Sequence, residues 1–509
     1  MEVKKVLLIK PSLYMTKELM EFLSFPIPLG LMYIAAYLEQ IGCEVKIFDT
    51  LLEGCNSQEL INENFTRIGL AKEKVIERIR EIKPDLIGIS NNFSAQFEAT
   101  LEMAEICKRA LPNVPLVVGG VHPSAVPADC VVHSFFDFVV VGEGEKTMAQ
   151  IVNYLNGRIK KEELKSCYFK DLVDGSRVIF NGQDDLIENL DRLPLPAYHL
   201  VDMEAYFNAT KFDATTRGGS SQRWASLITS RGCPYGCVFC SEHLVQRHKW
   251  RYHSPEYVAH HVKFLVDNYK VNNFSIDDGN FTLNLERAEN ILDLIKVFKP
   301  TLIFPNGVRA DRMTVSLAKK LKAAGCRELT LAIEHGDQEF LNRVIGKSLN
   351  LSVAIENIKK LKKLKIPTTA FFIFGLPPEN KKTLKSTITL IYKLARMGVV
   401  PNISLAMPLP GTDLTRNAIA DGYLDHVPTP TELAMASSKH YQFINTPFSP
   451  NELSRKKQQV FLGAILLVVV FHFFTFLKFP LVQATFADLL SWQKIKKRWV
   501  KVKGLLQYN

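Results

Sequence analysis

The sequence is poor in cysteine and has no low-complexity tract. Nine cysteines among 509 residues are too few to staple a secreted protein. No signal peptide is visible, because Met1–Lys5 leads directly into strand-like residues. A composition of 47% hydrophobic and 23% charged residues excludes a disordered or collagen-like chain. Since the chain is longer than one hydrophobic core usually serves, we expect several domains in a reducing, cytoplasmic environment.

Positive charge is concentrated near the C-terminus. The formal net charge is +11, of which residues 451–509 carry +8 and residues 1–450 carry +3. The same segment contains the apolar run 460–477, in which His472 and Thr475 are polar. As a helix this run would be about 27 Å long, close to the thickness of a bilayer core. It predicts association with an anionic membrane surface rather than nucleic acid, although an interfacial helix or a core helix would fit the same pattern.

Short apolar runs alternate with helical spacing in the first third of the chain, and each run is apolar on both faces. This pattern indicates an α/β fold with a parallel, Rossmann-like (flavodoxin-type) sheet covered on both sides. Ligands of such sheets bind at the carboxyl ends of the strands, where glycines follow several runs. The predicted strands are 4–10, 44–49, 85–90, 115–120 and 137–142.

A second series of strand-like runs begins after a polar, turn-rich stretch. Six successive β/α units fit a partial (β/α)6 barrel of the TIM type, with chemistry at the carboxyl ends of its strands. The predicted strands are 225–230, 274–278, 302–307, 328–334, 369–375 and 402–407. The predicted divisions are domain 1–155, linker 156–221, barrel 222–412 and a helical C-terminal region 413–509.

Three cysteines lie close together after the first predicted barrel strand. Cys233, Cys237 and Cys240 form a C-x3-C-x2-C loop, and thiols this dense in an intracellular chain are typically metal ligands. A four-iron cluster normally takes four thiolates, so three leave one iron open to an external ligand. A structural zinc ion completed by His243 or His248 is the alternative. The other six cysteines lack short paired spacing, which argues against a second cluster.

The cysteine loop and the later strand ends resemble the radical S-adenosylmethionine enzymes. The resemblance implies that S-adenosylmethionine chelates the open iron and is cleaved by one electron to methionine and a 5'-deoxyadenosyl radical, which abstracts hydrogen from unactivated carbon. By position it places Phe239 near the adenine, and Asp278, in the family's strand-two segment, near the methionine amine. Arg309 and Glu334 match positions facing the methionine carboxylate and the ribose. Helix capping or a satisfied structural carboxylate would also explain Asp278 and Glu334.

The N-terminal domain resembles the cobalamin-binding module found ahead of such barrels in methylases and in anaerobic cyclases. Many cobalamin domains carry a D-x-H-x-x-G motif, whereas Asp49–Gly54 here has Leu51 at the histidine position. The resemblance therefore implies cobalamin without a lower imidazole from this loop; a domain that binds nothing is the alternative. The implied cobalamin residues are Ser90, Gly119, Gly120, Gly142 and Glu143.

Together these features predict a membrane-associated radical enzyme that binds a [4Fe-4S] cluster, S-adenosylmethionine and cobalamin. We expect it to methylate an unactivated carbon of a hydrophobic, lipid-like substrate, with electrons from a ferredoxin or flavodoxin. Ring formation or oxidation of a lipid or tetrapyrrole is an alternative, and a non-enzymatic cobalamin or redox sensor a distant one. The sequence identifies no catalytic acid or base; Tyr198 and His199 are candidates by residue type alone.

Overall fold

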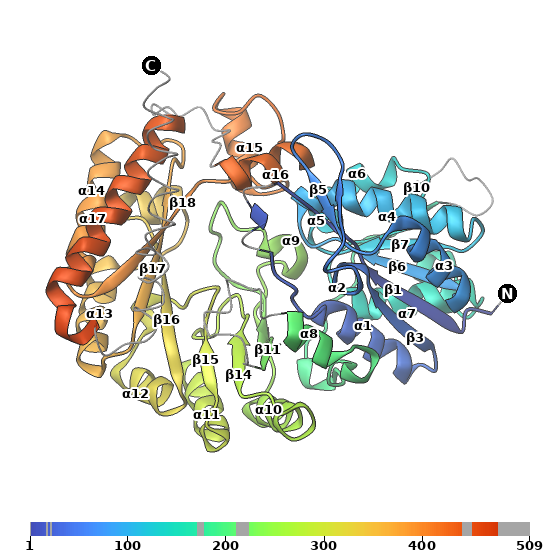
Figure 1. The fold of residues 1–509 in the computed structure, drawn as a ribbon, viewed down its shortest axis with the longest axis horizontal. Coiled ribbons are helices and arrows are strands. Elements are labelled where there is room, and N and C mark those ends of the chain that lie inside the picture. The colour runs from blue at the N-terminus through green and yellow to red at the C-terminus, as the bar shows by residue number, and fades with distance from the viewer. Residues whose placement is uncertain are drawn as a thin grey trace.

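The computed structural model describes residues 2–16, 19–20, 23–170, 178–209, 223–439 and 450–476. It contains two α/β units, one blue to cyan and one green to orange in Figure 1, followed by C-terminal helices. Both predicted sheets are present. The domain boundaries proposed from the sequence remain predictions.

The N-terminal sheet is parallel through five strands, in the order expected of a flavodoxin-type fold. Strand β1 shows why both faces are covered, because Val6 and Leu8 are buried on one side and Leu7 and Ile9 on the other. The five strands, in spatial order, are β3 (Glu44–Asp49), β1 (Lys5–Lys10), β6 (Leu86–Ser90), β7 (Leu116–Gly119) and β8 (Phe138–Val140). Helices α1 (Leu29–Gln40) and α7 (Gly144–Leu155) cover one face, and α3 (Lys72–Ile82) and α4 (Phe97–Ala110) cover the other.

Smaller elements surround this sheet. They include the antiparallel sheet β2 (Leu13–Met15), β5 (Thr66–Ile68) and β4 (Gln58–Leu60), and the short helices α2 (Thr50–Glu53), α5 (Val121–Ala125) and α6 (Pro127–Val131).

The segment expected to be a linker contributes to both units. Strands β9 (Cys167–Lys170) and β10 (Val178–Phe180) extend the N-terminal sheet with antiparallel pairing. Further on, Leu190, Tyr198 and the short helix α8 (Met203–Ala209) pack into the main core of the barrel. The short strands of four and three residues gave too little periodicity to be predicted from the sequence.

The barrel is an open sheet of six parallel strands, as predicted. Its strands, in order, are β11 (Trp224–Leu227), β14 (Asn273–Ile276), β15 (Thr301–Ile303), β16 (Cys326–Glu334), β17 (Thr368–Phe374) and β18 (Val399–Leu405). The helices between them are α10 (Pro255–Tyr269), α11 (Leu285–Ile295), α12 (Val315–Ala323), α13 (Leu351–Leu364) and α14 (Lys381–Ala395). The short ribbon β12 (Ser230–Arg231) and β13 (Arg251–Tyr252) and helix α9 (Glu242–Gln246) flank the cysteine loop.

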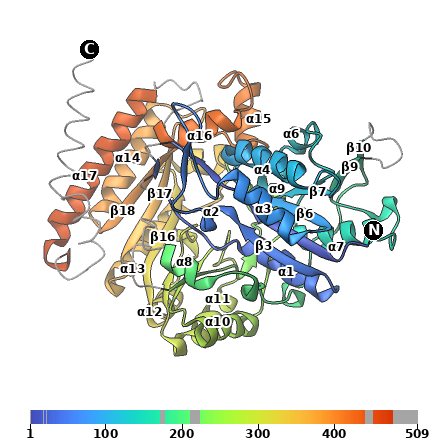
Figure 2. The ribbon, with the colours of Figure 1, turned by 45° about the vertical axis from the view of Figure 1, so that its right-hand side comes forward.

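The last helices return to both units. Helix α16 (Pro430–Lys439), which follows α15 (Asp413–Ala420), packs against the N-terminal domain near α4. Helix α17 (Pro450–Phe476) lies along α14 and β18 at the outer edge of the barrel, as the red helix in Figure 1 and Figure 2 shows.

The apolar run expected to reach a membrane is part of α17 up to Phe476. Val460, Ala464 and Val468 are buried in the barrel core, and a Cβ added at Gly463 would lie 2.9 Å from the Tyr392 hydroxyl. Within the described ranges, no helix is long and apolar enough to cross a membrane. The expected membrane association is therefore not supported. One apolar face of α17 packs on the barrel, and Leu462, Leu466 and Val470 on the other face are exposed. Residue 477 and the basic, aromatic stretch 492–499 lie outside the described residues.

This packing predicts opposite responses on the two faces of α17. Ala464 is fully buried, so Ala464→Glu should lower the free energy of unfolding by about 3 kcal/mol or more, because it buries an unpaired charge. Leu466 is 63% exposed, so Leu466→Glu should change it by no more than about 0.5 kcal/mol. Urea unfolding of both variants checks this, and equal effects would contradict the packing.

Candidate functional site

The cysteine loop lies between β12 and α9, and all three thiols are half-buried. Two backbone hydrogen bonds hold its centre, since Val238 N donates to Ile345 O at 2.9 Å and Leu414 N donates to Val238 O at 2.8 Å. Burial raises the pKa of the Cys237 thiol, and raises that of Cys240 to about 11. These thiols therefore favour the protonated form at neutral pH, and binding of a metal would have to release their protons.

The loop 345–348 packs against the backbone of the cysteine loop. A Cβ added at Gly346 would lie 2.5 Å from Gly236 O, so the two backbones are in close contact. Next to this glycine, Lys347 Nζ forms a buried ion pair with Glu334 Oε1 at 2.9 Å. The Lys347 cation opposes the effect of burial on the pKa of Cys237. Lys347 was not predicted from the sequence, in which the Gly-Lys pair shortly after the fourth barrel strand was the available signal.

The four residues predicted to contact S-adenosylmethionine all lie around the cysteine loop. Phe239 is partly buried against the barrel core. Arg309 lies over the ring of Tyr235, 3.9 Å from its centroid, and donates to Lys347 O and Ser348 O, both at 2.9 Å. Glu334 has a left-handed backbone with φ of 72° and already binds Lys347. Arg309 and Glu334 thus have protein partners, and their contacts with the cofactor remain predictions.

Asp278 connects the ends of the first two barrel strands. Its carboxylate accepts hydrogen bonds from Thr229 N at 2.6 Å, Thr229 Oγ1 at 2.5 Å and Ser230 Oγ at 2.7 Å. Both oxygens are engaged immediately before the cysteine loop, and burial raises its pKa. This geometry favours a structural role; the predicted contact with the methionine amine remains a prediction.

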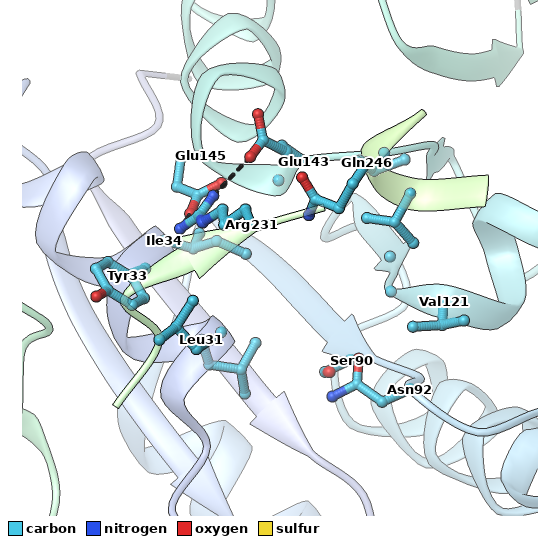
Figure 3. Close-up of a pocket in the computed structure, with 18 of the residues that line it drawn as sticks. Leu31, Tyr33, Ile34, Ser90, Asn92, Val121, Glu143, Glu145, Arg231 and Gln246 are labelled. Carbon is cyan, nitrogen blue, oxygen red and sulfur yellow. Dashed lines mark hydrogen bonds and ion pairs between the residues drawn. The ribbon is translucent and has the colours of Figure 1, made fainter. Parts of the chain in front are cut away.

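A cavity of about 380 Å³ lies between the two domains, and we call it the shared cavity. It is bounded by the carboxyl ends of β6, β7 and β8 on one side and of β11, β14 and β15 on the other, so both parallel sheets point their carboxyl ends toward it. Figure 3 shows Ser90 and Asn92 on the N-terminal side and Arg231 and Gln246 on the barrel side. The predicted cobalamin residues all line it: Ser90, Gly119, Gly120, Gly142 and Glu143.

The N-terminal wall of the shared cavity is largely glycine backbone. Gly120 has φ of 122°, and a Cβ there would lie 2.2 Å from Asn91 O. Gly142 has φ of 87° at the next strand end. Such a wall lets a broad, flat ring approach the backbone closely, which fits cobalamin.

The loop that carries the cobalt-binding histidine in many cobalamin domains is packed against neighbouring apolar side chains in this protein. Leu51 is buried in an apolar cluster with Met15, Phe25 and Ile68. Asp49 begins α2 as its N-cap and accepts a hydrogen bond from Tyr206 Oη at 2.6 Å. Leu51 thus belongs to a small core, and this loop offers cobalt no imidazole.

Histidines near the site have structural partners. His122 is buried, contacts Phe97 with the two rings tilted by 43°, and hydrogen-bonds Ser94 Oγ at 3.0 Å through Nδ1; burial lowers its pKa to about 4. His243 and His248, the alternative zinc ligands, stack on each other at 5.0 Å. Among the residues that the structure describes, no three His, Cys, Asp or Glu side chains converge closely enough to hold one metal ion.

The other candidates lie away from the shared cavity. Tyr198 is buried in the barrel core with its hydroxyl 2.8 Å from His261 Nε2, and His199 is exposed beside Glu39. Five of the six remaining cysteines are buried, and Cys55 is half-buried. None of these side chains supplies a catalytic acid or base to the cavity.

Two half-buried carboxyl groups line the barrel side of the shared cavity. Asp277 accepts a hydrogen bond from Ser275 Oγ at 2.5 Å, and Glu242 accepts one from Gly232 N at 3.1 Å. Burial raises the pKa of both. Glu242 was missed from the sequence, where it is one more acidic residue after the cysteines.

Comparisons with known proteins agree with this geometry. The family model described as the radical SAM superfamily matches residues 227–391, and that of the B12 binding domain matches residues 19–152. Cytidylyl-2-hydroxyethylphosphonate methyltransferase of Streptomyces wedmorensis is 30% identical over 470 residues, covering 87% of this chain and 86% of that protein. The anaerobic magnesium-protoporphyrin IX monomethyl ester cyclase of Rubrivivax gelatinosus is 26% identical, covering 76% and 65%.

A solved structure shows the same fold. The radical S-adenosylmethionine methyltransferase TsrM of Kitasatospora setae, with cobalamin and a [4Fe-4S] cluster bound, superposes with a TM-score of 0.65 at 16% identity, covering 92% of this chain and 91% of that one. The chain belongs to the cobalamin-dependent radical S-adenosylmethionine enzymes, a family of methyltransferases and anaerobic cyclases. Its cofactors are a [4Fe-4S] cluster, S-adenosylmethionine and cobalamin.

The cysteine loop predicts a selective loss of iron. Cys237→Ala should abolish the cluster and all cleavage of S-adenosylmethionine, because one iron loses its thiolate. Cys55→Ala, at a half-buried cysteine outside the loop, should keep both. Iron content, visible absorbance and 5'-deoxyadenosine formation measure the effect, and intact cleavage in Cys237→Ala would contradict the assignment.

The raised pKa of the half-buried Asp277 predicts a pH-dependent gain of stability on substitution. Because burial raises its pKa, the folded protein holds this proton more tightly than the unfolded chain, and stability falls as pH rises through the raised value. At pH values above the ordinary aspartate pKa, Asp277→Asn should therefore raise the urea midpoint. At lower pH the substitution should have less effect.

Asp293 is the control with the opposite sign. Hydrogen bonds from Lys296 and Lys320 lower its pKa, so Asp293→Asn should lower the midpoint at neutral pH. Urea titrations over a pH series compare the two variants. A difference for Asp277→Asn that does not vary with pH would contradict the inference.

Proposed function

We propose that this enzyme methylates an unactivated carbon of a hydrophobic, lipid-like small molecule bound at the shared cavity. The proposal rests on one observation: the carboxyl-terminal strand ends of both sheets line the same cavity. The glycine wall of the cobalamin domain forms one side, and the strand ends beside the cysteine loop form the other. A methyl donor and a radical source can act on one substrate only when both lie next to it.

When bound, the cluster and S-adenosylmethionine supply a radical that abstracts hydrogen, and cobalamin supplies the methyl group that replaces it. The chain itself holds and orients these groups. Cys233, Cys237 and Cys240 would hold the cluster, and Gly119, Gly120 and Gly142 leave room for the corrin ring. Helix α9 packs against α5 beside the cavity.

The lining of the shared cavity supports an apolar substrate with a polar group. Leu31, Ile34 and Met148 form apolar wall, whereas Asp277 and Glu242 can donate hydrogen bonds when protonated. Raised pKa values favour that protonated form. The apolar helix α17, which first suggested a lipid, lies on the outer face of the barrel and adds no support for this substrate class or for a membrane partner. A ferredoxin or flavodoxin as electron donor remains a prediction.

Ring formation or oxidation of a lipid or tetrapyrrole is the second candidate. It is favoured by the cyclase of Rubrivivax gelatinosus, whose name specifies a tetrapyrrole ester. Reactions of this kind use the same radical but transfer no methyl group. The nucleoside products separate the two, because methyl transfer yields S-adenosylhomocysteine in addition to 5'-deoxyadenosine.

The test is a product analysis with anaerobically reconstituted protein. The protein, loaded with iron, sulfide and hydroxocobalamin, is incubated with S-adenosylmethionine, reductant and a lipid extract, and the products are quantified by mass spectrometry. We expect both nucleosides to rise together while one lipid gains the mass of a CH2 unit. Formation of 5'-deoxyadenosine alone, with a lipid losing hydrogen, would favour ring formation or oxidation and overturn the methylase assignment. Cys237→Ala is the negative control.

A further inference from the structure

Two arginines lie directly opposite each other on the ribbon that leads into the cysteine loop. Arg231 on β12 pairs with Arg251 on β13 in antiparallel register, and both side chains are more than nine-tenths buried. Like charges at such a cross-strand position repel, and burial adds the cost of removing them from water. The ribbon can hold this pair only if carboxylates come to it.

The carboxylates come from the other domain, at the start of α7. Glu143 accepts hydrogen bonds from Arg231 Nη1 at 2.8 Å and from Arg251 Nη1 at 2.9 Å, and Glu145 accepts one from Arg231 Nη2 at 2.7 Å. Both glutamates are buried, and the Arg231 guanidinium lies 5.2 Å from the centroid of the Tyr33 ring on α1. We call Arg231, Arg251, Glu143 and Glu145 the interdomain ion network.

The network also binds the segment between the domains. Ile187 N donates to Glu143 Oε2 at 3.1 Å, and Arg251 Nη1 donates to Ile187 O at 2.7 Å. Glu143 was expected to bind cobalamin, but its oxygens are directed to the two arginines and this amide. Although burial acts to raise it, the two arginines lower the pKa of Glu143, which therefore stays charged. The dashed line in Figure 3 marks its contact with Arg231.

The position of the interdomain ion network links the two cofactor sites. Arg231 is separated from Cys233 by Gly232 alone, whose φ is 82° and whose added Cβ would lie 2.1 Å from Lys249 O. The backbone between Arg231 and the first cysteine thus has a conformation that favours glycine and leaves no room for a side chain. On the other side, Glu143 lies between Gly142 and Gly144, and all three line the shared cavity.

Buried ion pairs contribute little net stability, but they restrict geometry, because a shifted packing leaves charges buried and unpaired. A network of four buried charges therefore selects one relative position of the glycine wall and the cysteine loop.

We propose that the interdomain ion network is a positioning device that sets the distance between the cobalamin site and the iron–sulfur cluster, with Arg231 and Glu145 as its positioning residues. This inference rests on the proposed function, since it assumes that both cofactors act in the shared cavity. It predicts that neutralising one member displaces the two sites relative to each other and impairs methyl transfer more than radical formation.

The test compares Glu145→Gln, Arg231→Gln and the double variant with the wild type, each as reconstituted full-length protein with measured iron and cobalamin content. Arg67→Gln is the matched control. Arg67 is equally buried and binds Glu102 at 2.6 Å, but within the N-terminal domain. Glu145→Gln keeps side-chain size and lies outside the iron-binding loop, so it carries the test if Arg231→Gln does not fold.

Two readouts report the position of the cofactors. The first is the ratio of S-adenosylhomocysteine to 5'-deoxyadenosine formed from S-adenosylmethionine and reductant with added hydroxocobalamin and no lipid. The second is the magnetic dipolar coupling between cob(II)alamin and the reduced cluster, measured by electron paramagnetic resonance, which depends on their distance and needs no turnover.

We expect each single variant to lower the nucleoside ratio by about tenfold or more and to change the dipolar coupling, because small displacements of reacting groups are costly. The double variant should be no worse than the worse single variant, since the two residues act through one contact. Arg67→Gln should leave both readouts at the wild-type level.

Ratios and couplings within about twofold of wild type in Glu145→Gln and Arg231→Gln would overturn the inference. So would an equal change in Arg67→Gln, because the effect would then be general destabilisation. If the wild type forms neither nucleoside, the proposed function fails, and the dipolar coupling alone decides whether the network sets the distance.

Discussion

The structure depends on the pairing of buried opposite charges across the boundary between its two α/β units. Arg231 and Arg251 cannot share a dry, two-stranded ribbon unless Glu143 and Glu145 reach them from α7. The same contact fixes how the N-terminal sheet faces the barrel, so the carboxyl edges of both sheets enclose one cavity. Each sheet alone would present an ordinary ligand-binding edge; together they provide a place where two cofactors can act on one molecule.

Much of the protein around the cavity serves to hold backbone in place. Asp278 joins the ends of β11 and β14, the loop at Gly346 supports the cysteine loop, and Arg309 stacks on Tyr235 within that loop. These buried polar groups are satisfied by protein partners, which keeps the half-buried thiols of the cysteine loop in a rigid setting. A rigid frame is what a reaction with a highly reactive radical requires, because misplaced groups would react with it.

The sequence predicted the strands and the chemistry well, for physical reasons. Strands buried on both faces are apolar throughout and stand out between amphipathic helices, and three cysteines within eight residues have few explanations. The role of Glu143 could not be predicted, since its arginine partners lie 88 and 108 residues away. The short strands β9 and β10 lacked periodicity. The packing of α17 on the barrel could not be predicted, because an apolar face toward a protein core and one toward lipid have the same composition.

Helix α17 also affects how the protein behaves in a crowded solution. The barrel sheet is open, and β18 is its last strand, so it would otherwise offer unpaired backbone groups to any neighbouring strand. The long helix packs against β18 and α14 with residues Leu453 to Val468. An incomplete barrel thus gains protection against edge-to-edge aggregation from a segment that follows the catalytic domain. Without α17, the edge strand β18 would be exposed to pairing with other chains, and the core would be smaller.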